Sequence, residues 1–167
     1  MVMAALGTDT LGSVRLPAAY CGLVGLKPTL GLVSTEGVVL LSPTFDHVGP
    51  ICLSVRDSML LLNILLDKSH SSWSHHPKKS YDLTRIRIGV LEQTPESDFT
   101  KEVSDGFEKA KAELRQNGAT LTSLSIPKLN LRKLRQQAFL IIEMEGSEAL
   151  ARPLQDHPES FSDGLKA

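Results

Sequence analysis

One glycine-rich stretch, residues 7–29, constrains the fold of this chain more than any other feature. It holds four glycines, two prolines and a single serine, Ser13, directly after Gly12. Because glycine permits positive φ and close backbone approach, the Gly12-Ser13 step predicts a sharp turn that presents the hydroxyl. Consecutive backbone N–H groups at such a turn can face one point and stabilise an anion or a developing oxyanion. With Asp9 and Arg15 on either side as an expected ion pair, the stretch is a candidate nucleophile loop.

Three runs within this stretch follow one another in a specific order: Gly7-Thr8-Asp9-Thr10, Gly12-Ser13-Val14-Arg15-Leu16-Pro17 and Cys21-Gly22-Leu23-Val24-Gly25-Leu26-Lys27-Pro28-Thr29. Together they resemble the signature of the amidase signature family. A long, ordered match is far more specific than one short motif. The resemblance continues through the Asp-x-x-Gly-Pro element at residues 46–50, the run at 88–90 and the helical stretch with Glu145 and Glu148, so it covers nearly the whole chain. Enzymes of this family hydrolyse carboxylic amides, or release ammonia from glutamine within transamidating complexes.

The resemblance implies that Ser13 is the nucleophile and forms an acyl-enzyme. The backbone N–H groups of Thr10, Leu11, Gly12 and Ser13 would form the oxyanion hole, where one donor is worth about 2.7–4 kcal/mol of barrier. Leu11 departs from the family, which usually has glycine there. In the family, a lysine activates the nucleophile through a second serine held at a cis peptide bond, and both lie upstream of the signature. Only 12 residues precede Ser13, so we expect neither helper in this chain and little activity from the chain alone.

Three functions fit this pattern. The first is an amidohydrolase that converts a carboxylic amide into an acid and ammonia. The second is the glutaminase (A) subunit of a tRNA-dependent amidotransferase, and the third is a non-catalytic, truncated or pseudoenzyme product. We expect a small-molecule amide substrate, no cofactor and no metal. We also expect association with a second copy or with the remainder of the enzyme, since a sheet cut on one side exposes strand edges and apolar faces.

Other reactive side chains have simpler interpretations. His47 next to Asp46 suggests a Ser13/His47/Asp46 triad, but adjacent residues seldom orient as base and partner. Lys27 is interpreted as structural, because the family's catalytic lysine is a different one.

Three histidines lie in a serine-rich stretch and are expected to stay solvated: His70, His75 and His76. The acidic residues of the last predicted helix are interpreted as charges on a solvated face: Glu143, Glu145 and Glu148.

Composition excludes several classes of function. The chain has 167 residues, 18 Lys and Arg against 19 Asp and Glu, and no basic block, so we expect no nucleic-acid partner. The longest apolar run, residues 59–66, is interrupted by Asn63 and is far shorter than the ~20 residues of a membrane span. The N-terminus lacks the positive residues of a signal peptide.

Cys21 and Cys52 give no disulfide framework and are expected to be free thiols, so we expect a cytoplasmic protein.

The hydrophobic pattern and the resemblance predict an α/β chain: part of the amidase signature fold, truncated, with a mixed β-sheet flanked by helices. We expect a signature core section at 1–66, a polar linker at 67–82, a strand-helix-strand-helix section at 83–150 and a polar tail at 151–167, which should fray from residue 155. The expected elements are strands at 2–6 and 23–26, turns at 42–50, a buried helix from an N-cap at Ser54 to about Asp67, strands at 85–91 and 119–126 around a helix at 98–116, and a helix at 129–150. The two later strands should pair in parallel.

Overall fold

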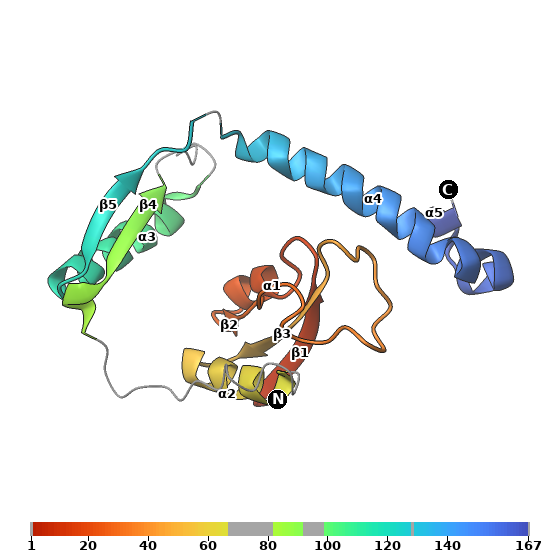
Figure 1. Ribbon diagram of the computed structural model, residues 1–167, viewed down its shortest axis with the longest axis horizontal. Coiled ribbons are helices and arrows are strands. Elements are labelled where there is room, and N and C mark those ends of the chain that lie inside the picture. Colours follow the sequence, from red (N-terminus) through yellow and green to blue (C-terminus); the bar gives the residue numbers. More distant parts are fainter. Residues whose placement is uncertain (1, 67–81, 92–98, 128, 167) are drawn as a thin grey trace. The chain divides into compact units, whose positions relative to one another are not determined.

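The computed structural model describes residues 2–66, 82–91, 99–127 and 129–166. The chain divides into a first unit, Met1–Pro77 with Gln137–Ala167, and a second unit, Lys78–Gln136. The helices and strands, labelled in Figure 1, are β1 (Ala4–Asp9), α1 (Arg15–Tyr20), β2 (Val24–Gly25), β3 (His47–Cys52), α2 (Val55–Leu65), β4 (Arg87–Leu91), α3 (Lys101–Gln116), β5 (Thr120–Leu124), α4 (Leu131–Asp156) and α5 (Asp163–Lys166), with short 3-10 turns at Leu83–Arg85 and Pro158–Ser160. The mixture of strands and helices is the α/β class predicted from the sequence. The linker predicted at 67–82 lies outside the described residues except for its last residue.

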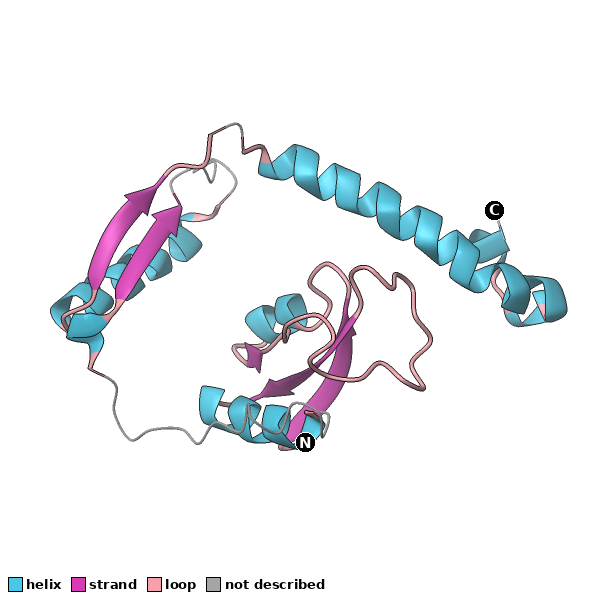
Figure 2. Ribbon diagram, in the orientation of Figure 1, coloured by secondary structure: helices cyan, strands magenta, loops and turns pink. Residues whose placement is uncertain are grey.

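An antiparallel three-stranded sheet, in the order β1-β3-β2, forms the centre of the first unit (Figure 2). The strands expected at 2–6 and 23–26 are both present, and β1 continues to Asp9. The register places Ala4 opposite Cys52 and Asp9 opposite His47. Asp9 is therefore the last residue of an ordered strand and stands immediately before the serine turn.

β3 occupies part of the stretch that was predicted as turns, and for residues 47–50 that prediction was wrong. Gly49 and Pro50 indicated a turn, but both fit this strand. The carbonyl of Pro50 accepts the N–H of Leu26 at 3.0 Å. Because the amide nitrogen and carbonyl of one residue point to the same side of a strand, the proline ring costs no hydrogen bond toward β1. A Cβ on Gly49 would lie 2.0 Å from the carbonyl oxygen of Leu26, so only glycine allows this approach.

The core of the first unit lies where α1 meets the sheet. Val14 and Ala18 are fully or almost fully buried, as is Cys52 on β3. A Cβ on Gly25 would lie 2.7 Å from the Val14 carbonyl oxygen and 2.8 Å from the Ala18 Cβ. Glycine at this position therefore lets α1 rest directly on β2, and the residues that follow Ser13 are held against the sheet.

The helix predicted after Ser54 is confirmed as α2. The Ser54 hydroxyl oxygen accepts the N–H of Asp57 at 3.1 Å, as an N-cap should. The expectation that this helix is buried was wrong, since Ser58 is its one buried residue. Leu60 and Ile64 are 48% and 77% exposed, because only one face of the leucine-rich pattern packs on the described part of the chain.

In the second unit, β4 and β5 pair in parallel with α3 between them, as predicted. The helix ends at Gln116 with Asn117 as its C-cap, and Gly118 has φ +95°, a left-handed conformation suited to glycine. A Cβ on Gly89 would lie 2.2 Å from Leu124 Cδ1, so the two strands are closely packed at this point. The apolar side of α3 is only partly covered by other described residues, since Leu114 is half-buried whereas Val103 and Phe107 are exposed.

α4 is longer than the helix predicted at 129–150. The prediction that the chain frays from residue 155 was wrong for residues 155–156, which still belong to this helix, and short helical turns follow at Pro158–Ser160 and Asp163–Lys166. An ion pair between Arg152 and Asp156, 3.5 Å apart, spans this last turn. Although α4 has 26 residues, neither it nor another helix of the described ranges combines the length and apolarity that crossing a bilayer requires.

Candidate active site

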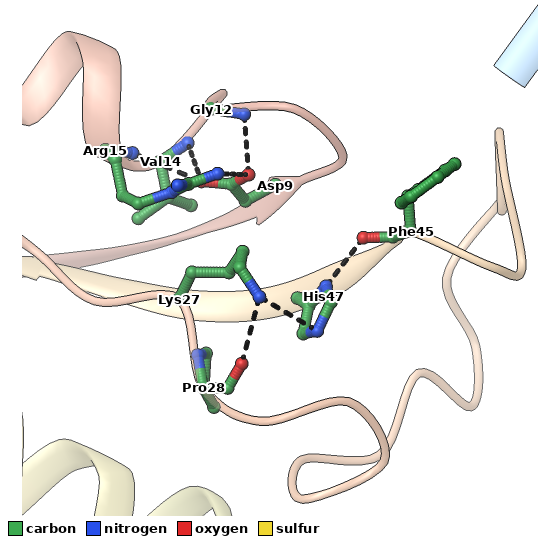
Figure 3. Close-up of polar contacts among 8 residues, drawn as sticks. All are labelled: Asp9, Gly12, Val14, Arg15, Lys27, Pro28, Phe45 and His47. Atoms are coloured by element: carbon green, nitrogen blue, oxygen red, sulfur yellow. Dashed lines mark hydrogen bonds and ion pairs between the residues drawn. The ribbon is translucent and has the colours of Figure 1, made fainter. Parts of the chain in front are cut away.

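The carboxylate of Asp9 shapes the loop that follows β1 (Figure 3). It is completely buried and accepts three backbone N–H groups, from Gly12 at 2.7 Å, Val14 at 3.2 Å and Arg15 at 3.3 Å. The guanidinium of Arg15 adds two more hydrogen bonds, each of 3.0 Å. The Asp9 carboxylate therefore closes the turn in two ways: it binds backbone N–H groups of the loop, and it pairs with the charged side chain of Arg15.

Asp9 is ionised in the folded chain. Burial raises the pKa of its carboxyl, but the hydrogen bond from Arg15 and those from the Val14 and Arg15 amides outweigh burial and lower the pKa from 3.8 to about 2. Arg15 responds in the opposite direction: its hydrogen bond to Asp9 raises the pKa of the guanidinium. The loop is therefore built around a permanent anion–cation pair at neutral pH.

Ser13 lies exposed on this loop, two residues before α1 begins. Gly12 has φ +139°, a conformation that L side chains rarely adopt, and a Cβ there would lie 3.0 Å from the side chain of Leu16. The turn thus depends on glycine at position 12. The Ser13 hydroxyl makes no hydrogen bond to another residue of the described ranges, so it is presented to the surface.

The backbone N–H groups around Ser13 have different surroundings. Gly12, which the resemblance counts among the oxyanion donors, directs its N–H to the Asp9 carboxylate at 2.7 Å. The N–H groups of Thr10, Leu11 and Ser13 have no hydrogen-bond partner within the part of the chain that the structure describes. Thr10 is fixed by its side chain, since its hydroxyl donates to Asp46 Oδ1 at 2.6 Å. Within the described part of the chain, three of the four expected donors, the amides of Thr10, Leu11 and Ser13, are therefore free to meet a ligand.

The Ser13/His47/Asp46 triad that was disfavoured from the sequence is not formed. His47 Nδ1 lies 2.6 Å from the Phe45 carbonyl oxygen and must donate to it, because a carbonyl only accepts. His47 Nε2 lies 3.2 Å from Lys27 Nζ, which also donates to the Pro28 carbonyl at 3.3 Å (Figure 3). Both ring nitrogens are therefore engaged away from Ser13. Within the described residues, the Lys27 ammonium makes these two hydrogen-bond contacts, and neither involves Ser13.

Asp46 closes the neighbouring loop. Its Oδ2 accepts the N–H of Leu41 at 2.6 Å and that of Ser42 at 2.9 Å, while its Oδ1 takes the Thr10 hydroxyl. The side chain is almost fully buried. Asp46 thus connects the loop at 41–46 to the residue at the start of the serine turn.

Glu145 was interpreted as a solvated charge, and this was wrong. Its carboxylate accepts hydrogen bonds from the hydroxyls of Ser42 and Thr44, and from the Thr44 N–H at 3.2 Å. These two hydroxyls hold the pKa of Glu145 below its usual value. No local pattern could have shown this contact, because Glu145 and Ser42 are 103 positions apart in the sequence.

The described residues contain no group of three or more His, Cys, Asp or Glu side chains that could hold a metal ion. His70, His75 and His76 lie outside them.

A cavity of about 450 Å³ lies beside Asp46, lined by residues of the 30–40 loop and by Pro43, and its lining does not include Ser13. Cys21 and Cys52 are both free thiols, the first exposed and the second buried.

Comparison with known proteins gives a consistent result. A family model described as Amidase matches residues 1–166. The chain is 40% identical over 156 residues to the A subunit of glutamyl-tRNA(Gln) amidotransferase from Halothermothrix orenii, a match that covers 89% of this chain and 32% of that protein. The crystal structure of the corresponding A subunit from Thermotoga maritima matches with a TM-score of 0.74 and 32% identity over 99% of this chain and 36% of that one. The native peptide amidase of Stenotrophomonas maltophilia matches with a TM-score of 0.72 and 32% identity over 94% of this chain and 34% of that one. The chain spans about a third of the length of the curated relatives it matches.

Proposed function

The chain belongs to the amidase signature family, and on this premise we propose that it carries the nucleophile of an enzyme that hydrolyses a carboxylic amide to an acid and ammonia. The observation that carries the proposal is the exposed Ser13 hydroxyl, held beside free backbone amides on a turn that Asp9 fixes from within. This is the arrangement that acyl transfer needs, because a nucleophile must stand next to donors for the developing oxyanion.

In the proposed reaction, Ser13 Oγ adds to the amide carbon and its proton goes to a base. The carbonyl oxygen becomes an oxyanion, which is stabilised by backbone N–H groups of residues 10–13, with Thr10, Leu11 and Ser13 as the donors that have no other partner among the described residues. Collapse of this intermediate breaks the C–N bond and the nitrogen leaves as ammonia after taking up a proton. Water then adds to the acyl-enzyme, which releases the acid and restores the Ser13 hydroxyl.

The base is the part of this mechanism that we assign to residues outside the chain. The resemblance gives that role to a lysine acting through a second serine, and both precede the signature in the family. The chain matches about a third of its relatives' length, so we propose that the helpers belong to the part that is not matched. On this proposal the 167 residues bind and orient the acyl group but hydrolyse amides slowly by themselves.

A second candidate is glutamine hydrolysis in a tRNA-dependent amidotransferase, with this chain in the role of the glutaminase (A) subunit. It is favoured by the curated relatives described above, whose names give them that role. In this case the acyl group is the γ-carboxamide of glutamine and the ammonia is passed to a partner protein. For either reaction we propose a cytoplasmic location, a small-molecule amide substrate and no cofactor. The free thiols of Cys21 and Cys52 suit a reducing compartment.

The test replaces the matched segment of the Thermotoga maritima homologue by residues 1–166 of this chain and measures ammonia release from glutamine and from a simple acyl amide. We expect hydrolysis by this hybrid, and a loss of about 10³-fold or more with Ser13→Ala. Ser34→Ala is the matched control, because Ser34 is exposed and its hydroxyl oxygen only accepts the Glu36 N–H at 3.1 Å.

Equal rates for Ser13→Ala and the parental hybrid would refute the assignment of the nucleophile. Activity with glutamine alone would select the second candidate, and activity with simple amides would select the first. A folded hybrid that hydrolyses neither would favour the non-catalytic alternative.

A further inference from the structure

We propose that Glu145 is a positioning residue, which holds the oxyanion side of the Ser13 turn in place through the loop at 41–46. The inference rests on the proposed function for its chemical meaning, but each contact behind it is a contact within the first unit. It assigns a task in the site to a carboxylate that the sequence analysis interpreted as a charge on a solvated face.

The first link joins α4 to the loop. Glu145 accepts three hydrogen bonds, from the Ser42 hydroxyl, the Thr44 hydroxyl and the Thr44 N–H. Hydrogen bonds to an ionised carboxylate are roughly twice as strong as neutral ones. Ser42 is completely buried, so its hydroxyl would lose its partner without gaining water if Glu145 were removed.

The close approach of α4 is built into its sequence. Gly146 is buried, and a Cβ there would lie 2.8 Å from Leu41 Cδ1 and 3.4 Å from the Leu41 carbonyl oxygen. Ile142, four residues earlier and so on the same side of the helix, is also buried. A glycine next to Glu145 thus lets the helix backbone come near enough for the carboxylate to reach the loop.

The second link crosses the loop. The Ser42 carbonyl accepts the N–H groups of Phe45 at 3.0 Å and Asp46 at 2.7 Å, which closes residues 42–46 into a tight turn. The side chain of Asp46 also stabilises this turn, because its Oδ2 accepts the N–H groups of Leu41 and Ser42. The turn is therefore rigid, and a displacement of Ser42 displaces the Asp46 carboxylate.

The third link reaches the site. Asp46 Oδ1 accepts the Thr10 hydroxyl at 2.6 Å, and Thr10 directly precedes Leu11 and directly follows Asp9. Asp9 in turn binds the N–H groups of Gly12 and Val14 on either side of Ser13. Glu145, Ser42, Asp46 and Thr10 thus form a continuous relay to the start of the oxyanion loop, whose position an amidase must hold within fractions of an ångström.

The first experiment uses the 167-residue chain and measures backbone hydrogen exchange residue by residue in wild type, Glu145→Ala, Glu145→Gln and the control Glu148→Ala. Glu148 is exposed on the same helix. We expect Glu145→Ala to raise exchange several-fold at the hydrogen-bonded amides of Leu41, Ser42, Gly12 and Val14. Glu145→Gln should raise it less, because the amide oxygen still accepts, and Glu148→Ala should leave it unchanged.

Faster exchange at Leu41 and Ser42 with no change at Gly12 and Val14 would overturn the proposal, since the relay would then stop at the loop. An equal rise along β1 and β3 would also count against it, because that pattern indicates general destabilisation of the first unit.

The second experiment places the same substitutions in the hybrid enzyme and separates kcat from KM. We expect Glu145→Ala to lower kcat about tenfold with less than about a twofold change in KM, and Glu145→Gln to recover part of it. A larger effect on KM than on kcat would contradict a role in the oxyanion loop. The two proposals fail separately: a Ser13→Ala hybrid that stays active refutes the function, whereas the exchange measurement tests the relay without any turnover.

Discussion

Asp9 and Arg15 meet across the turn that presents Ser13, with Nε and Nη2 of the arginine each 3.0 Å from a different oxygen of the carboxylate. The carboxylate is completely buried, whereas the arginine side chain is 48% exposed. A buried anion is tolerated only when its donors are in place, and Asp9 has backbone donors as well as this cation. The buried Asp9 carboxylate therefore determines the shape of the serine turn.

Asp9→Asn should destabilise the first unit. The substitution removes the charge and turns an amide group toward five donors, so we expect the free energy of unfolding to fall by about 3 kcal/mol. Urea denaturation followed by circular dichroism measures this. Asp105→Asn, which removes the partner of an exposed Lys101, should change stability by less than about 0.5 kcal/mol. Equal effects of the two substitutions would contradict the role given to Asp9.

The stability of the chain should depend on acid pH through Asp9. A group whose pKa falls on folding, here from 3.8 to about 2, contributes stability above its unfolded pKa and loses it as the pH falls through the folded pKa. Between about pH 4 and pH 2 we expect wild type to lose about 2 kcal/mol more than Asp9→Asn. Comparing the two proteins isolates Asp9 from Glu102 and Glu145, whose pKa values are also lowered. Parallel pH profiles would show that Asp9 is not the group responsible.

Gly49→Ala should disrupt β3. The new Cβ would lie 2.0 Å from the carbonyl oxygen of Leu26, a backbone atom that cannot rotate away, so we expect a loss of about 2–4 kcal/mol. Gly106→Ala is the matched control, because nothing lies within 4 Å of the added methyl group in the middle of α3. It should stabilise the chain by about 0.5–1 kcal/mol through helix propensity. Thermal melts of both variants check the pair, and a harmless Gly49→Ala would refute the close approach.

His47→Gln should leave catalysis largely intact. Both ring nitrogens of His47 are hydrogen bonded, to Phe45 and Lys27, so the residue is not available as a base for Ser13. We expect about 1–2 kcal/mol of destabilisation and ammonia release by the hybrid within about threefold of the parental rate. A loss of ammonia release as large as that of Ser13→Ala would support the Ser13/His47/Asp46 triad instead.

The isolated chain should associate in solution. Large apolar side chains are exposed on β1 and directly before it, among them Leu6 and Met3, and Ile64 on α2 is exposed as well. Exposed apolar groups next to a strand edge favour pairing with another chain. Light scattering after size exclusion should give a mass that rises with concentration. A single monomeric mass at every concentration, with a cooperative melt, would contradict this expectation.

Local chemistry was enough to predict many elements. The N-cap at Ser54, the end of α3 at Asn117-Gly118 and the parallel pair β4-β5 each follow from a few neighbouring residues. The central strand β3 was missed because glycine and proline indicate turns locally, while here Gly49 and Pro50 fit the neighbouring chain at Leu26. Burial of α2 was overestimated for the converse reason: a leucine-rich helix gives no sign of how many of its sides are covered.

The serine turn itself could be located from its glycines, but its supporting contacts could not. The contacts of Asp9 lie within six positions of it and were partly expected as an ion pair with Arg15. The Thr10–Asp46 and Ser42–Glu145 contacts join residues 36 and 103 positions apart. Such pairings arise from tertiary packing, which neither charge nor periodicity encodes in a single sequence.

The separation of 103 positions between Ser42 and Glu145 also matters during synthesis. Translation at about 5–20 residues per second delivers that length in roughly 5–20 s. During this interval the strands β1, β2 and β3 are already made, while the carboxylate of Glu145 that binds Ser42 does not yet exist. The Ser42–Glu145 contact can therefore form only after this part of α4 has been synthesised.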